Sequence, residues 1–287
     1  MIVDSFDRIE FLHSILPFIK KYSGSVFVIK YGGAAMRNLS DVSLVVEDIL
    51  FLYYLGIKPV VIHGGGPFIN DWLIKVNIEP KFHEGLRITD SATMEIVQMV
   101  LSGKVNKQLV SVFNKNSKKN LAVGLSGHDA CLVQAEPLFN LPDNFIGRVT
   151  GVNTEIIQLL FDSNYIPIIA STGVDNLGQS YNINADTVAG VIAGSLKAQK
   201  LFLLTDSPGI MYDINDHSSV IKNLNFQIIE DLKAKNIING GMIPKSNACL
   251  EALNHGVDSA HIIDGRLKHS LLYEVFTEDR LGSMITL

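Results

Sequence analysis

A repeated unit constrains this chain more than any other feature: an apolar strand that ends in glycines and is followed by a helix. The strand SVFVIK at 25–30 leads into YGGAAM and a helix at about 40–55. The strand KPVVIH at 58–63 leads into GGGP and a helix at about 67–77. β-Branched and aromatic runs favour buried strands, and strand–helix alternation favours a parallel sheet. The sequence therefore predicts an α/β fold with helices packed on the sheet.

The alternation of helices and strands continues along the chain. An amphipathic helix is expected at 4–22, with a kink or break at Pro17, because proline has no N–H to donate inside a helix. A turn-rich segment at 171–180 predicts a boundary between two lobes. The other expected elements are a short hairpin or lid at 81–88, helices at about 90–116, 154–163, 226–236, 243–255 and 268–276 and in NADTVAGVIAGSL, short antiparallel strands within 120–152, and the strands YIPIIA, KLFLLT and SAHIID.

Composition restricts the class of protein. With 47% hydrophobic residues and a net charge of −5, a chain of 287 residues is expected to build a large core and not to bind nucleic acid, which needs a broad basic surface. Cys131 and Cys249 form no CxxC pair and are expected to be buried thiols in a reducing compartment. No run reaches membrane-spanning length, and the acidic Asp4, Asp7 and Glu10 do not suit a targeting peptide, so an intracellular protein is expected.

The first candidate site lies where the first strand ends. Lys30 is followed by Tyr31, Gly32 and Gly33, so a cation stands beside backbone N–H groups that glycine leaves accessible. Such an arrangement suits a phosphate group. A lysine at a strand end is more often simply solvated, so this motif decides nothing by itself.

A second glycine-rich loop follows His63, at 64–67 (GGGP), and precedes a helix. Helix N-termini and glycine turns bind anions, although a tight structural turn is the alternative. The dinucleotide pattern GxGxxG fails because Ile69 replaces its third glycine. The Walker A pattern fails in GGMIPKS because Pro244 stands where glycine must precede Lys245.

Two further motifs open helices. NINAD at 182–186 supplies either an ordinary helix cap or a functional carboxylate at Asp186. GGMIPK at 240–245 places Lys245 in the first turn of a helix, where a cation opposes the helix dipole unless an anion lies nearby. Together, glycine-rich loops, two lysines and a carboxylate suit phosphoryl transfer, in which a protein mainly positions reactants and neutralises charge.

The ordered set VIKYGGAAM, VIHGGGP, GLRITD, NINADTVAG, LLTDSPGI and GGMIPKS resembles the amino acid kinase family from about residue 24 to 287. The likeness is to the branch that uses ATP with Mg²⁺ to phosphorylate the γ-carboxylate of N-acetyl-L-glutamate. It implies an open three-layer αβα sandwich with a mainly parallel sheet. By this resemblance, the helix at 1–23 serves oligomerisation or regulation, an N-lobe at 24–178 binds acetylglutamate, and a C-lobe at 179–287 binds ATP. The metal would be held mainly by the nucleotide phosphates, with no protein ligand set.

The resemblance also implies roles for individual residues. Two lysines would stabilise the transferring phosphoryl group while an aspartate orients them, and an arginine would hold a substrate carboxylate. The implied residues are Lys30, Lys245 and Asp186 for catalysis; Gly64, Gly65, Arg87 and Asn182 for the substrate; and Gly32, Gly33, Thr205, Asp206, Gly209 and Ile210 for the nucleotide and its phosphates.

Regulation is a further implication. Arginine-inhibited members carry an N-terminal helix, thought to interlace dimers into a hexamer (a trimer of dimers), and His261 and Glu274 match the arginine-contacting stretch. Arg280 and Phe18 depart from that pattern, and His128 departs from GLSGKDG. Photosynthetic members also bind the signalling protein PII. A bacterial cytoplasm and a plastid stroma both fit this reading.

Three alternatives stay open. The chain could be a family kinase for glutamate, aspartate, carbamate or UMP, although Arg87 in GLRITD and the NINAD spacing favour acetylglutamate. It could be a regulatory protein that has lost catalysis, against which Lys30, Asp186 and Lys245 speak. A nucleotide-binding oxidoreductase is disfavoured by the missing GxGxxG.

Overall fold

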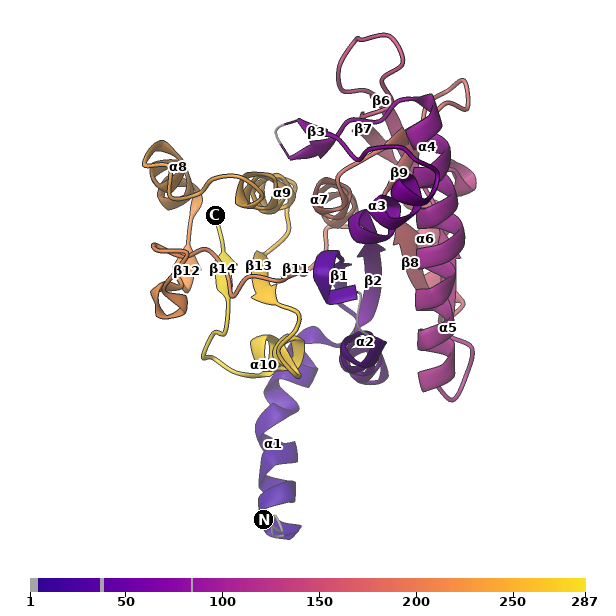
Figure 1. Cartoon of the computed structure of the whole chain (residues 1–287). Coiled ribbons are helices and arrows are strands. Elements are labelled where there is room, and N and C mark those ends of the chain that lie inside the picture. The colour runs from indigo at the N-terminus through magenta and orange to yellow at the C-terminus, as the bar shows by residue number, and fades with distance from the viewer. Residues whose placement is uncertain (1–4, 37–38, 84) are drawn as a thin grey trace.

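The computed structural model describes residues 5–36, 39–83 and 85–287 and is built on an eight-stranded sheet (Figure 1). The strand order is β12-β14-β13-β11-β1-β2-β8-β5. All neighbouring pairs are parallel except β13 and β14, which are antiparallel. The strands are β1 Val26–Tyr31, β2 Lys58–His63, β5 Ala122–Leu125, β8 Ile166–Ala170, β11 Lys200–Thr205, β12 Asn223–Leu224, β13 Ser259–Asp264 and β14 Ser283–Ile285.

Alternation along the central strands produces the layers. In β1, Phe27 and Ile29 belong to one apolar cluster, whereas Val28 belongs to a second cluster. Successive side chains of a strand point to opposite faces, so the two clusters are the two faces of the sheet. Figure 1 shows α2 and α10 on one face and α7 and α9 on the other. The predicted three-layer αβα sandwich is confirmed.

Helices cover both faces and one end of the molecule. The α-helices are α1 Ser5–Tyr22, α2 Leu39–Tyr54, α3 Gly66–Lys75, α4 Ser91–Gln98, α5 Asn106–Asn116, α6 Glu155–Asp162, α7 Ala185–Ser195, α8 Phe226–Ala234, α9 Met242–Asn254 and α10 Ser270–Phe276. The short 3₁₀ helices are η1 Gly33–Met36, η3 Asp129–Cys131 and η4 His217–Ser219, and η2 Met99–Val105 is a π-helix between α4 and α5. Within the described residues, no helix is long and apolar enough to cross a membrane.

A smaller, mostly antiparallel sheet stands beside the main one. Its order is β10-β9-β6-β7, with β6 Val133–Pro137, β7 Gly147–Val152, β9 Thr172–Val174 and β10 Ser180–Asn182. The expected hairpin is confirmed as β3 Phe82–His83 and β4 Leu86–Arg87. The lobe boundary expected at 178/179 falls in the turn between β9 and β10.

Three expectations need correction. Helix α1 continues through Pro17 without a break, and Pro17 is exposed, so the carbonyl four residues earlier is free to bind water. Residues Ala122–Leu125, expected to be antiparallel, pair in parallel with β8 in the main sheet. Cys249 is buried as expected, but Cys131 is exposed. Asp4, the first residue of the predicted N-terminal helix, lies outside the described residues.

Close packing of α7 on α9 holds the functional ends of these helices together. A Cβ atom added to Gly190 in α7 would lie 2.6 Å from the backbone oxygen of Ala248 in α9. The three nearest atoms are all backbone atoms of Ala248, so the helices themselves would have to separate.

We therefore expect Gly190→Ala to lower the free energy of unfolding by about 1–3 kcal/mol, the usual cost of overpacking, despite alanine's higher helix propensity. Urea denaturation measures the effect. Gly103→Ala is the matched control, because a Cβ there meets no atom within 4 Å and should leave stability equal or higher. Equal stability of both variants would show that α7 and α9 tolerate separation.

Candidate active site

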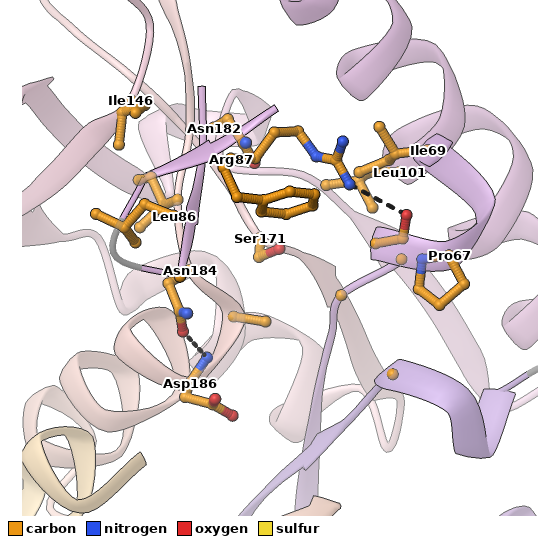
Figure 2. Close-up of a pocket in the computed structure, with 18 of the residues that line it drawn as sticks. Pro67, Ile69, Leu86, Arg87, Leu101, Ile146, Ser171, Asn182, Asn184 and Asp186 are labelled. Carbon is orange, nitrogen blue, oxygen red and sulfur yellow. Dashed lines mark hydrogen bonds between the residues drawn. The ribbon is translucent and has the colours of Figure 1, made fainter. Parts of the chain in front are cut away.

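The site lies at the carboxyl ends of β1 and β2. Tyr31 pairs with His63 at the last position of the two strands, so the two glycine loops begin level with each other. The Gly64 N–H donates to the Tyr31 carbonyl at 3.3 Å, which joins the loops directly. A cavity of about 220 Å³ opens above them (Figure 2). The second glycine loop, the β3–β4 hairpin, Ser171 and the start of α7 enclose this first cavity.

One carboxylate bridges two lysines at the centre. The Lys30 Nζ lies 3.0 Å from Asp186 Oδ1, and the Lys245 Nζ donates to Asp186 Oδ2 at 2.8 Å. Asp186 stands in the first turn of α7, where the helix dipole favours an anion. Lys245 stands in the first turn of α9, where the dipole disfavours a cation. The cluster keeps one net positive charge, which draws an anion to this point.

Burial makes these charges strongly dependent on one another. Burial lowers the pKa of the Lys30 ammonium below its usual 10.5, against the attraction of Asp186. Burial would raise the pKa of Asp186, but the charges of Lys30 and Lys245 outweigh it and hold that pKa below 3.8. The carboxylate is therefore ionised at neutral pH and compensates cations that would otherwise be expensive to bury.

The two glycines after Tyr31 shape the first loop. A Cβ on Gly32 would lie 3.3 Å from Lys30 Cε and 3.4 Å from the Gly64 nitrogen, so a side chain there would press on the ammonium group. Gly33 has a φ of +73°, a conformation that L-residues rarely adopt. Gly33 also lines the first cavity, together with Gly64 and Gly65.

Arg87 supplies a cation on the far side of the first cavity. Its Nη2 donates to Asn70 Oδ1 at 2.6 Å and to the Gly66 carbonyl at 3.2 Å, and its guanidinium lies over the Phe82 ring. Burial lowers the pKa of Arg87 to about 10, so the group stays charged at neutral pH. Within the described part of the chain, its buried Nη1 has no hydrogen-bond partner. A buried, unpaired N–H of a cation is suited to bind an anion.

Asn182 lines the same cavity and is held by a neighbour that sequence reasoning missed. Its Nδ2 donates to Thr89 Oγ1 at 3.0 Å, and that hydroxyl donates to the Arg87 carbonyl at 2.8 Å. Asn184 caps α7 by accepting hydrogen bonds from the Asp186 and Thr187 N–H groups, which was one of the two readings of NINAD. The helix-cap pattern was visible in the sequence, whereas the Thr89 contact spans 93 positions and leaves no local signal.

A second cavity, of about 810 Å³, lies on the other side of Asp186. The predicted loop residues line it, together with Asp186 and Lys245 from the charged cluster: Thr205, Asp206, Gly209 and Ile210. The sequence reasoning missed its apolar lining, which comes from Met211, Tyr212, Ile214, Ile237 and Met242. Asp186, Asn184 and Gly85 line both cavities, so the two cavities meet at the charged cluster.

His261 and Glu274 lie elsewhere, in neither of these cavities. His261 Nδ1 lies 2.9 Å from Glu274 Oε1, and both side chains are fully buried. Glu274 is also 3.5 Å from Arg280 Nη1 and accepts from the Leu281 N–H at 3.2 Å. The Lys200 Nζ completes the cluster, 3.1 Å from His261 Nε2. The structure thus brings together a buried carboxylate and several basic groups between β13 and α10.

The α/β fold and this pair of joined cavities define a class of protein. Residues 25–264 match the model of the Amino acid kinase family, so the chain belongs to this family. It is 56% identical to an acetylglutamate kinase of Gracilaria tenuistipitata var. liui, over 99% of this chain and 100% of that one. It is 49% identical to the acetylglutamate kinase of Thermosynechococcus vestitus, over 99% of this chain and 96% of that one.

Solved structures agree on the fold. A structure of N-acetylglutamate synthase from Neisseria gonorrhoeae superposes with a TM-score of 0.83 at 24% identity, over 99% of this chain and 64% of that one. The smu.665 protein of Streptococcus mutans superposes with a TM-score of 0.76 at 28% identity, over 91% and 98% of the two chains.

The buried lysines should make Asp186 essential for stability. We expect Asp186→Asn to lower the free energy of unfolding by about 3 kcal/mol, because removing one partner leaves a buried charge uncompensated. The double variant Lys30→Met, Asp186→Asn should recover part of that loss, since it removes the buried cation as well. Urea denaturation of the three proteins at neutral pH measures both effects. A double variant no more stable than Asp186→Asn would contradict this account of the cluster.

Proposed function

We propose that this chain transfers the γ-phosphoryl group of MgATP to the γ-carboxylate of N-acetyl-L-glutamate, forming N-acetyl-L-glutamyl 5-phosphate and ADP for arginine biosynthesis. The observation that carries the proposal is the meeting of two cavities at Lys30, Asp186 and Lys245, one of them holding a free Arg87 N–H. The identity of the substrate comes from the acetylglutamate kinases, to which the chain is about half identical along nearly their whole length.

The charged cluster suits this chemistry. A carboxyl group with a pKa near 4.3 is already ionised at neutral pH, so the reaction needs no general base. A carboxylate oxygen bonds to the γ-phosphorus while the bond from that phosphorus to the bridging oxygen breaks, and ADP leaves with the electron pair. The difficulty is bringing an anion to a polyanion. Lys30 and Lys245 would reduce this repulsion by neutralising charge on the transferring group, while Asp186 holds both ammonium groups in place.

The two cavities divide the reactants between them. In the first, Arg87 Nη1 and Asn182 would bind acetylglutamate, with the backbone of Gly64 and the N–H group of Gly65 facing its reacting end. In the second, Thr205, Asp206, Gly209 and Ile210 would bind the nucleotide. Its phosphates would extend past the charged cluster to Gly33, which lines the first cavity, and to Gly32 beside Lys30. Mg²⁺ would enter with ATP, because both Asp186 oxygens face lysines and the described residues offer no group of three acidic, His or Cys ligands.

The direct test is ADP release from MgATP with N-acetyl-L-glutamate, in parallel with glutamate, aspartate, carbamate and UMP. Turnover with acetylglutamate alone supports the proposal. Turnover with another acceptor assigns the chain to a different reaction within the same family, and no turnover with any acceptor removes the catalytic proposal altogether.

The two lysines should act on the rate. We expect Lys30→Ala and Lys245→Ala each to lower kcat by about 10²-fold or more, the size seen when a preorganised charge-stabilising group is lost. Lys115→Ala, an exposed lysine in the last turn of α5, is the control and should keep kcat unchanged. Steady-state kinetics with folded variants decide the point, and near-normal kcat in both would defeat this mechanism.

Arg87 should act on substrate binding. We expect Arg87→Lys to raise the KM for acetylglutamate by about tenfold, because lysine keeps the charge but loses the planar fork that binds a carboxylate with two N–H groups. The KM for ATP serves as the internal control, since Arg87 lines only the first of the two cavities. An unchanged KM for acetylglutamate would remove Arg87 from the substrate site.

Arginine inhibition is the regulatory part of the proposal, with Glu274 and His261 as the effector site. A guanidinium group binding Glu274 would have to compete with Arg280, which already lies 3.5 Å from that carboxylate. We expect Arg280→Ala to lower the half-inhibitory arginine concentration by about tenfold, equivalent to one contact of ~1.4 kcal/mol. Arg148→Ala, which removes an exposed arginine paired with Glu136, is the control. Arginine without effect on either protein would dismiss the site.

Assembly and setting complete the proposal. Helix α1 exposes Ile9, Leu12 and Leu16 to solvent, by 63%, 57% and 37%. An apolar helix face of this kind supports a homo-oligomer in which α1 joins dimers into a hexamer.

The relatives come from red algae and cyanobacteria, which supports a location in a plastid stroma or a bacterial cytoplasm and makes PII a candidate partner.

A further inference from the structure

His63 ends β2 immediately before the second glycine loop, and its side chain is fully buried. Its Nδ1 lies 2.9 Å from the Gly64 carbonyl oxygen. Its Nε2 lies 3.0 Å from the side-chain nitrogen of Asn106, the first residue of α5 after the π-helix η2. The imidazole therefore connects the glycine loop to a helix distant in sequence. The mechanism proposed above makes no use of it.

The surroundings of Asn106 determine which ring nitrogen of His63 carries the proton. Asn106 Nδ2 also donates to the carbonyl groups of Ile168 at 2.8 Å and Leu125 at 3.2 Å, and Asn106 Oδ1 accepts from Lys107. Two carbonyl oxygens require a donor, so the amide nitrogen must face them, and it also faces His63. Its two N–H bonds are shared among these three neighbours. Because an amide nitrogen donates and does not accept, Nε2 has to be an acceptor, which leaves the proton on Nδ1. Burial also lowers the pKa of His63 to about 4, so the ring is neutral at neutral pH.

The Nδ1 proton in turn determines how one peptide group is oriented. With the proton on Nδ1, His63 donates to the Gly64 carbonyl oxygen. The C=O of Gly64 and the N–H of Gly65 belong to the same planar trans peptide and point in opposite directions. Holding the carbonyl toward buried His63 therefore turns the Gly65 N–H away from the core. It then faces the first cavity, which Gly64 and Gly65 line.

The π-helix holds the other side of the same loop. A Cβ on Gly65 would lie 2.6 Å from Leu101 Cδ2 and 3.3 Å from Val105 Cγ2, so these two side chains of η2 pack directly on the Gly65 backbone. Asn106 follows Val105 at once. π-Helical turns inside α-helices are frequent at functional sites. Here η2 and the start of α5 contact the glycine loop twice, through apolar packing and through His63.

We propose that His63, held by Asn106 as the neutral tautomer protonated on Nδ1, is a positioning residue that aims the Gly65 N–H at the reacting end of the substrate. The inference rests on the proposed function for its substrate, but its geometry rests on His63, Asn106 and Gly64 alone. A histidine that merely fills the core would contribute stability and no more, and this difference can be measured.

The first measurement is the tautomer itself, in the wild-type protein. Histidine ¹⁵N NMR at pH 7, with the ring signals of His63 assigned in the wild type through correlations to its own backbone, should show a protonated Nδ1 and an unprotonated Nε2 for that ring. A His63 ring protonated on Nε2, or on both nitrogens, would overturn the proposal. This readout needs neither substrate nor catalysis, so it remains decisive if a variant fails to fold.

The second measurement compares two replacements of His63. In His63→Asn, the side-chain amide nitrogen takes the place of Nδ1 and keeps the donor to Gly64, while Asn106 keeps the Leu125 and Ile168 carbonyls. In His63→Gln, the amide reaches the place of Nε2 beside Asn106 and the donor to Gly64 is lost. Both variants remove the buried ring, so both should lose thermal stability to a similar extent.

Only the position of the Gly65 N–H separates the two variants. We expect His63→Asn to stay within about threefold of wild-type kcat/KM, and His63→Gln to fall by about tenfold, the effect of one lost buried hydrogen bond. His255→Gln, at an exposed histidine after α9, controls for the replacement itself. Equal losses of kcat/KM in both His63 variants would show that the histidine only fills space. If the wild type does not act on acetylglutamate, the proposed function fails, and the tautomer measurement still judges the role of His63.

Discussion

The ion pairs of Asp186 with Lys30 and Lys245 are the contacts on which the rest of this molecule depends. Lys30 comes from β1, Asp186 from α7 and Lys245 from α9, so three elements far apart in sequence meet through one carboxylate. Neither lysine position is favourable alone, since one ammonium is buried and the other opposes a helix dipole. Close packing of α7 on α9 at Gly190, together with the Asn184 cap, keeps the carboxylate where it compensates both.

Much of this arrangement could be predicted from the sequence, because it follows from local patterns. Apolar strands that end in glycine predicted the parallel sheet, and strands of that kind place their carboxyl ends at one edge, which brought Lys30 and the second glycine loop together. The Asp186 position was visible as a helix start. Family resemblance added the proposed roles of Arg87, Asn182 and the loop at Thr205, which no local pattern indicates.

Contacts between distant residues could not be predicted. Thr89 holds Asn182, Asn70 holds Arg87, and Asn106 holds His63, and none of these pairs has a spacing that predicts contact. The difference at Pro17 has another cause: proline removes one helical hydrogen bond, but this proline is exposed, so water can bind the freed carbonyl and the helix continues. Local sequence patterns therefore predicted the charged cluster and the glycine loops. The residues that hold functional side chains in position became visible only in the fold.

The path of the chain at the middle of the sheet has a broader consequence. After β1 the chain enters α2, whose Val42 and Val45 join the cluster on one face, whereas the loop after β11 places Ile210 in the cluster on the other face. The connections diverge where β1 and β11 lie side by side, so a crevice must open there whatever side chains line it. Under the proposed function, evolution can therefore change the acceptor through the hairpin around Gly85, or the nucleotide through the loop at 209–214, while the crevice and its central charges stay unaltered.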